Sequence, residues 1–117
     1  MDLNQAIAKH AEWKVKFRTA ITKQDAMDVD TISKDNCCEL GKWLYGEARV
    51  KFAKFSSHSE CVSKHAAFHV EAGKVARTIN ARKYTEAESM LGAGTSYTTA
   101  SGNVAVAIAH LKKEASL

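Results

Sequence analysis

Apolar residues recur every three or four positions in three long stretches of the chain, and this spacing predicts three long helices. The first stretch covers residues 2–23, where Ile7 and Phe17 lie on one side. The second covers residues 57–81, and the third covers residues 85–114. Proline is absent, so no residue of this kind interrupts the helices. The pattern therefore predicts an all-α chain.

Short polar signals mark where two of these helices begin. Asp2 followed by Gln5 resembles a capping box, and Ser57 followed by Glu60 repeats the arrangement before the second helix. The third helix contains many small residues between positions 92 and 102. These small residues weaken the helix locally, but they allow another helix to approach closely.

The segment between the first two long helices is polar and broken. Residues 24–36 carry four aspartates and predict a loop with one short helical turn at residues 31–34. A short helix is expected to start at Cys37, with Asn36 as its cap. Residues 49–55 then predict a further helical turn or two.

These elements together predict an antiparallel helical bundle of four main helices plus short helical segments. Consecutive helices joined by short turns pack antiparallel around an apolar core. The chain has 117 residues, which suits one modest hydrophobic core. We therefore expect residues 1–117 to form a single domain.

Composition and charge exclude several classes of partner. Hydrophobic residues make up 45% and charged residues 26% of the chain, which is typical of a soluble globular protein. The net charge of +4 comes from scattered basic residues without interleaved aromatics, so we expect no nucleic-acid binding. The most apolar run, residues 104–109, is far shorter than the roughly 18 residues of a membrane span. The polar N-terminal residues do not resemble a signal peptide.

The cysteines do not indicate a disulfide framework. There are three of them, Cys37, Cys38 and Cys61, and the first two are adjacent. A reducing cytoplasm fits this usage, because thiols are then available to bind a metal.

Four side chains are candidate metal ligands. His65 and His69 are four residues apart, so they share one helix face and can point at one atom. His10 lies on the apolar side of the first helix, and Cys38 lies in the short helix. Inward side chains on facing helices build the metal sites of helical bundles. Three imidazoles and one thiolate suit zinc, which takes four N/S ligands in structural sites.

A simpler interpretation exists for each of these residues alone. A histidine on an apolar face is commonly a hydrogen-bonded core residue, and a single cysteine is commonly a small buried hydrophobe. Together, however, three inward histidines without a buried acid would be costly to bury unpartnered. His58 and His110 are expected to lie on the solvent side or to cap helices, so we leave them outside the site.

Three short motifs together resemble the chemoreceptor zinc-binding domain. In this chain they read His10-Ala-Glu-Trp13, Cys38-Glu-Leu-Gly41-Lys-Trp43 and His65-Ala-Ala-Phe-His69. The first two motifs are separated by 24 residues and the last two by 21 residues, as in that family. The signature spans residues 10–69, and Cys37 and Cys61 are not part of it.

The resemblance implies a zinc ion held by His10, Cys38, His65 and His69. It also implies roles for the other motif residues. Gly41 would allow close helix packing, Trp43 would form an apolar wall around the site, and Trp13 would pack against the same cavity. Plain core packing explains these last three residues equally well.

The function that the resemblance implies is that of a regulatory or sensor domain of a bacterial chemoreceptor. Zinc would keep Cys38 as a thiolate, the form that oxidants attack. A zinc ion with one thiolate and three neutral imidazoles carries net charge +1, which would attract an anionic oxidant such as hypochlorite. Oxidation of Cys38 would then be relayed to chemotaxis signalling. The alternatives are a zinc-availability sensor that controls a diguanylate cyclase or a receptor, and a purely structural zinc module.

No enzymatic activity is expected. A metal with four protein ligands has no position for an activated water, and the sequence offers no nucleophile–base pair. Domains of this family are usually cytoplasmic parts of a longer chemoreceptor, and less commonly of a diguanylate cyclase. The resemblance therefore implies an output domain in the same protein and a homodimer, for which the small-residue stretch 92–102 is a candidate face.

Overall fold

The computed structural model describes all 117 residues, and it contains seven helices and no strand. The helices are α1 (Leu3–Lys23), α2 (Val29–Ile32), α3 (Glu39–Tyr45), α4 (Glu47–Phe52), α5 (Ser56–Asn80), α6 (Tyr84–Met90) and α7 (Ser96–Glu114). None of them combines the length and the apolar character needed to cross a membrane. The predicted all-α class is confirmed.

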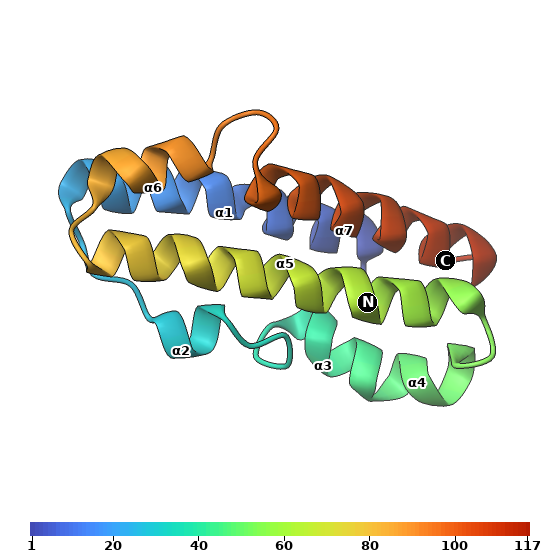
Figure 1. Cartoon of the computed structure of the whole chain (residues 1–117). Coiled ribbons are helices and arrows are strands. Elements are labelled where there is room, and N and C mark those ends of the chain that lie inside the picture. The colour runs from blue at the N-terminus through green and yellow to red at the C-terminus, as the bar shows by residue number, and fades with distance from the viewer.

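The helices form an elongated antiparallel bundle with α5 at its centre (Figure 1). Helices α1, α6 and α7 cover one side of α5, and the short helices α2, α3 and α4 cover the other. The colour gradient shows that α1 and α5 run in one direction, whereas α2–α4 and α6–α7 run in the opposite direction. The predicted antiparallel bundle is therefore present, but its second and fourth segments are broken into shorter helices.

The core lies along the inner face of α5. Phe68, Val75 and Ala76 of this helix have no exposed surface, and they belong to one apolar cluster with Phe17 of α1 and Ile108 of α7. Buried positions of α5 recur at intervals of three and four, as the helical period requires. The same face carries His65 and His69, so the core and the candidate metal ligands share one helix surface.

Helix α1 begins as predicted, whereas α5 does not. The Asp2 side chain accepts a hydrogen bond from the Gln5 N–H at 3.1 Å and caps α1. The expected Ser57–Glu60 box is absent: Ser57 donates from its N–H and its hydroxyl to the Glu114 carboxylate, at 3.3 and 2.7 Å. An acid from the far end of the chain thus satisfies the first turn of α5.

The predicted continuous helix over residues 85–114 is wrong, because residues 91–95 separate α6 from α7. Gly94 has φ +76°, a conformation that a side chain would disfavour. The Thr95 hydroxyl donates to the Met90 carbonyl at 2.8 Å, and its oxygen also caps α7. Threonine side chains that bond locally to the backbone compete with helix formation, which explains the break.

The segment before α3 also differs from the prediction. Helix α2 supplies the short turn expected near residues 31–34, but α3 starts at Glu39 rather than earlier. Its N-cap is Cys38, whose Sγ accepts the Gly41 N–H at 3.4 Å, and not Asn36. The candidate ligand therefore lies at the junction of a loop and a helix rather than inside a helix.

Candidate metal centre

Four side chains from three elements converge beside the core. His10 comes from α1, Cys38 from the N-cap of α3, and His65 and His69 from successive turns of α5. One potential ligand atom from each residue lies within 4.8 Å of the others. The structure therefore brings together the four residues that the sequence motifs single out.

The separations between these atoms fit a single tetrahedral cation. Nε2 of His65 lies 3.1 Å from Nε2 of His10 and 3.0 Å from Nε2 of His69. Sγ of Cys38 lies 3.2, 3.7 and 4.0 Å from Nε2 of His65, His69 and His10. Ordinary Zn–N and Zn–S bond lengths place tetrahedral nitrogen ligands about 3.3 Å apart and sulfur about 3.6 Å from each nitrogen. The two nitrogen–nitrogen separations are about 0.2–0.3 Å shorter than this value, and the three sulfur–nitrogen separations lie on either side of theirs.

The hydrogen bonds of two histidines fix which ring nitrogen faces the centre. Nδ1 of His10 lies 2.7 Å from the Ala6 carbonyl oxygen, and Nδ1 of His69 lies 2.8 Å from the Ile32 carbonyl oxygen. A carbonyl only accepts, so each Nδ1 must carry the proton and each neutral ring presents a bare lone pair at Nε2. Two lone pairs aimed at one buried point repel each other unless a cation or a donated proton lies between them. This arrangement is that of metal-binding histidines with carbonyl support.

His65 completes the histidine group at its most buried point. Its side chain has no exposed surface, and Nδ1 has no hydrogen-bond partner. Burial, together with the neighbouring His69 and His10, lowers the pKa of His65 to about 3. Burial is also the main cause that lowers the pKa of His10 and of His69. All three rings are therefore neutral near pH 7, the form that binds metal.

Cys38 is the least enclosed of the four residues, since it is only partly buried. Burial raises the pKa of its thiol above the ordinary value, while the N–H groups of the helix start, first of all that of Gly41, act in the opposite direction. Without a cation the residue is thus a neutral thiol near pH 7. A divalent cation at the centre would favour the thiolate instead.

Gly41 is required where α3 meets the preceding loop. A Cβ built on this residue would lie 1.7 Å from the Asp35 carbonyl oxygen, a separation that no side chain can occupy. Gly41 therefore does allow a close backbone contact, as the sequence indicated. The contacting segment is the loop at Asp35, however, and not another helix. This contact seats the loop against α3 one turn away from Cys38.

The two tryptophans have different surroundings. Trp13 packs on Phe17 with ring centroids 5.5 Å apart, and it also lines a surface cleft that reaches His10 and Cys38. Trp43 is partly buried and packs near Phe52, with centroids 6.1 Å apart. The structure therefore places Trp13 beside two candidate ligands, whereas the described contacts of Trp43 are with the core.

The two remaining histidines lie outside the group. His58 is buried, so the expected solvent-side position is wrong. Its Nε2 lies 2.9 Å from the carbonyl oxygen of Leu44 in the last turn of α3, which agrees with the expected alternative of a helix-capping residue. His58 is buried because α3 and α4 fold over the first turns of α5 (Figure 1). His110 is exposed as expected and pairs with Glu60 at 3.2 Å.

The other cysteines also lie outside the group. Cys61 is fully enclosed in the apolar core, where burial raises the pKa of its thiol to about 12. Such a thiol stays protonated and unreactive. Cys37 is exposed next to Cys38, and its thiol lies 3.6 Å from the Asn36 side-chain oxygen.

Sequence reasoning missed the groups that support the ligands. The carbonyls of Ala6 and Ile32 are backbone groups, so no residue type marks them. The position of Ala6 four residues before His10 in a helix is the one signal that was present. An ion pair between Lys9 and Glu39, at 3.5 Å, was also missed although each residue is the neighbour of a ligand.

Comparison with known proteins agrees with this geometry. The family model of the chemoreceptor zinc-binding domain matches residues 10–76, which is more than half of the chain. The matched range begins at His10 and contains all four converging residues. No curated protein and no solved structure matched the chain.

Proposed function

Because the chain belongs to the chemoreceptor zinc-binding domain family, we propose that it is a regulatory sensor domain in which His10, Cys38, His65 and His69 bind one Zn²⁺. The observation that carries the proposal is the pair of Nε2 lone pairs that Ala6 and Ile32 direct towards the same buried point. Metal-binding histidines use this arrangement, in which a carbonyl holds the Nδ1 proton and leaves Nε2 free for the cation.

Zinc is the metal that suits this donor set best. One thiolate with three imidazoles in a tetrahedron is typical of zinc, and harder cations prefer oxygen ligands. Four protein ligands leave no open position for water, so we propose a regulatory site and not an enzyme. When bound, zinc would supply the positive charge that keeps Cys38 ionised.

We propose that Cys38 is the residue that senses the oxidant. It is the only partly exposed member of the group, and it is a thiolate when the cation is present. Oxidation by an oxidant such as hypochlorite would remove two electrons from Sγ and give sulfenic acid, a weaker donor. Loss of this one contact would loosen α3 while the histidines of α1 and α5 keep their positions.

In the intact protein this change would reach an output domain, either chemotaxis signalling or, alternatively, a diguanylate cyclase. Family membership supports a cytoplasmic setting and a homodimer. These partners are carried over from the family and have no contact in this chain that argues for them.

A zinc-availability sensor is the second candidate. The clustered lone pairs favour it, because a metal-free centre would lose the cation that holds α1, α3 and α5 together. In that case the signal would be whether zinc occupies the centre, and not whether Cys38 is oxidised. A zinc affinity too tight for the site ever to empty in the cell would exclude this candidate.

Elemental analysis of protein purified without added metal tests the site. We expect about one zinc per chain, and a loss in both His65→Ala and Cys38→Ala but not in His110→Ala. Equal zinc in all four proteins would contradict the proposal.

Treatment with stoichiometric oxidant, followed by circular dichroism, separates the candidate functions. If Cys38 is the sensing residue, oxidant should change the helicity of the native protein but not that of Cys38→Ser. A purely structural zinc predicts altered stability with no effect of oxidant on any output.

A further inference from the structure

A cleft of about 400 Å³ leads from the surface to the candidate metal centre. It opens between α1 and the start of α3, and His10 and Cys38 lie in its wall. Its other side chains include Gln5, Glu12 and Trp13 of α1. A cleft of this size is comparable to small-molecule pockets and is many times larger than one water molecule.

The other sides of the centre are closed. His65 has no exposed surface, and His10 and His69 are also buried. Four further surface pockets contain none of the four converging residues in their walls. Among the five described pockets, this cleft alone contains members of the group in its wall, and it therefore offers a dissolved molecule a route to Sγ of Cys38.

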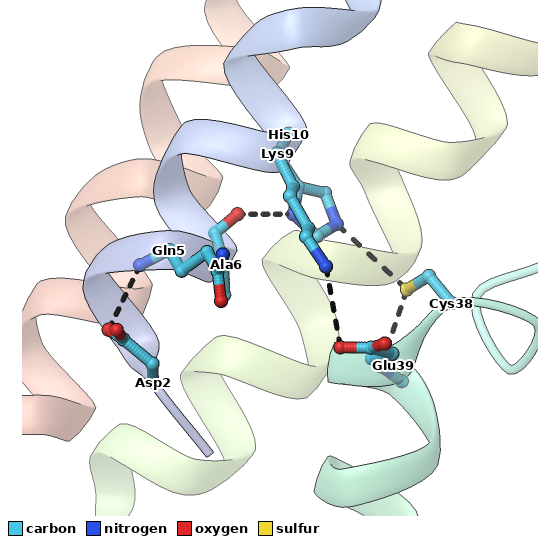
Figure 2. Close-up of polar contacts among 8 residues, drawn as sticks. Asp2, Gln5, Ala6, Lys9, His10, Cys38 and Glu39 are labelled. Atoms are coloured by element: carbon cyan, nitrogen blue, oxygen red, sulfur yellow. Dashed lines mark hydrogen bonds and ion pairs between the residues drawn. The ribbon is translucent and has the colours of Figure 1, made fainter.

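Two contacts cross the gap between α1 and α3 at this point (Figure 2). His10 and Cys38 approach each other at 4.0 Å, and the residues next to them, Lys9 and Glu39, form an ion pair at 3.5 Å. The two contacts run side by side, one partly buried and one exposed. The ion pair therefore borders the mouth of the cleft.

The charged side chains of the cleft nearly balance. Three carboxylates and two ammonium groups line it, namely Asp2, Glu12, Glu39, Lys9 and Lys16. Lys9 is paired with Glu39, and Lys16 lies over the Trp13 ring at 4.6 Å from its centroid. The lining therefore has no excess of positive charge. Its carboxylates offset, at the mouth of the cleft, the attraction that a zinc centre of net charge +1 would exert on anions.

We propose that this cleft is the access route for a small uncharged oxidant, a peroxide or a hypohalous acid, to Sγ of Cys38. The inference rests on the proposed function, since it assumes that Cys38 is the oxidised residue. It adds the path and the charge class of the oxidant. The cleft does not select between oxidants by size, because it is wider than a peroxide or a hypohalous acid.

The reaction that the cleft admits is a two-electron oxidation. With hydrogen peroxide, the thiolate sulfur of Cys38 attacks one oxygen, the S–O bond forms as the O–O bond breaks, and the electron pair leaves on hydroxide. The products are cysteine sulfenic acid and hydroxide. With a hypohalous acid, sulfenic acid forms in the same way and halide is the reduced product.

Occluding the cleft tests the route. Gln5→Trp and Glu12→Trp each place a large ring at an exposed lining position of α1, and Ala8→Trp places the same ring at an exposed position of α1 outside the cleft. All variants carry Cys37→Ser, which removes the competing exposed thiol. The zinc-loaded proteins are treated with hydrogen peroxide, and sulfenic acid at Cys38 is followed by dimedone labelling and mass spectrometry.

We expect either lining variant to slow labelling by about threefold or more, since access controls thiol reactivity. The Ala8→Trp control should match the parent, and all proteins should keep the same zinc content and melting temperature. Raising the salt concentration should change the parent rate less than about twofold, because an uncharged reagent is not steered. Equal rates in all variants, or a steep fall with salt, would overturn the route while leaving oxidation of Cys38 intact. Absence of Cys38 oxidation in the parent, with hydrogen peroxide and with hypochlorous acid alike, would overturn the proposed redox function itself.

Discussion

The candidate metal centre has a histidine half, His65 and His69 of α5, and a cysteine half, Cys38 at the start of α3. The two halves are built differently. His65 and His69 project from the middle of a 25-residue helix that is packed on several sides, and neither is exposed. Cys38 lies where an irregular loop meets a seven-residue helix, and it is partly exposed beside a cleft. One half is fixed by the core, whereas the other depends on local contacts. Under the proposed function, this difference predicts that the histidines retain the metal and that the cysteine side is the part that moves.

Removing a ligand from the fixed half should have the largest effect. His65→Ala leaves a buried gap between His10 and His69, and we expect zinc affinity to fall by roughly 1000-fold. Isothermal competition against a chelator of known affinity measures the loss. Cys38→Ser, which keeps all three imidazoles, should lose less. A greater loss in Cys38→Ser than in His65→Ala would reverse the assignment of the two halves.

Acid should lower the free energy of unfolding of the metal-free protein through its buried histidines. Burial lowers the pKa of His65 to about 3, below its value in the unfolded chain, so the unfolded state binds more protons as the pH falls below about 6.5. The stability that neutral His65 contributes is complete above that pH and declines towards pH 3. We expect a slope of about 1.4 kcal/mol per pH unit for each histidine that stays neutral in the folded state.

Urea unfolding of the metal-free protein between pH 7 and pH 4.5 checks this slope. The matched variants are His65→Asn, which should flatten the pH dependence, and the exposed His110→Asn, which should not. Identical slopes in the parent and in His65→Asn would show that the buried histidine does not set the acid sensitivity.

A methyl group at Gly41 should damage the cysteine half alone. In Gly41→Ala the new Cβ meets the Asp35 carbonyl, so the loop that seats α3 must shift, at a cost of about 2 kcal/mol. We also expect weaker zinc binding, because Cys38 begins the same helix. Gly102→Ala is the control, since nothing lies within 4 Å of that Cβ, and it should stabilise α7 by about 0.5–1 kcal/mol. Thermal unfolding of both variants measures the contrast, and equal melting temperatures would contradict it.

The exposed ion pair should contribute least. Lys9 and Glu39 are at least half exposed, and pairs of this kind contribute less than about 1 kcal/mol. Glu39→Gln should therefore leave zinc content and melting temperature nearly unchanged. If this variant lost zinc, the cysteine half would depend on the surface bridge rather than on its backbone contacts. Elemental analysis and a thermal melt on one sample decide this.

The same contrast explains what the sequence could predict. The periodic apolar residues of α1 and α5 predicted these long helices and placed His10, His65 and His69 on inner faces, because helical spacing alone determines which side chains share a face. The details that failed depend on contacts between distant residues or on side chains that bond to backbone. Glu114 caps α5 from 57 positions away, and Thr95 interrupts the last helix.

The cleft and its ion pair were also beyond sequence reasoning. Lys9 and Glu39 are 30 positions apart, and only the folded arrangement of α1 against α3 brings them together. The proton positions of His10 and His69 depend on carbonyl groups, which every residue has. Motif residues therefore pointed to the centre, whereas its tautomers and its access route required the structure.

X-ray absorption at the zinc edge, measured before and after one equivalent of oxidant, tests the central claim most directly. The account predicts one sulfur at about 2.3 Å and three nitrogens at about 2.0 Å in the untreated protein. After oxidation it predicts loss of that sulfur contact with the nitrogens retained. A zinc environment without sulfur at the start, or one in which nitrogens leave and sulfur stays, would contradict it.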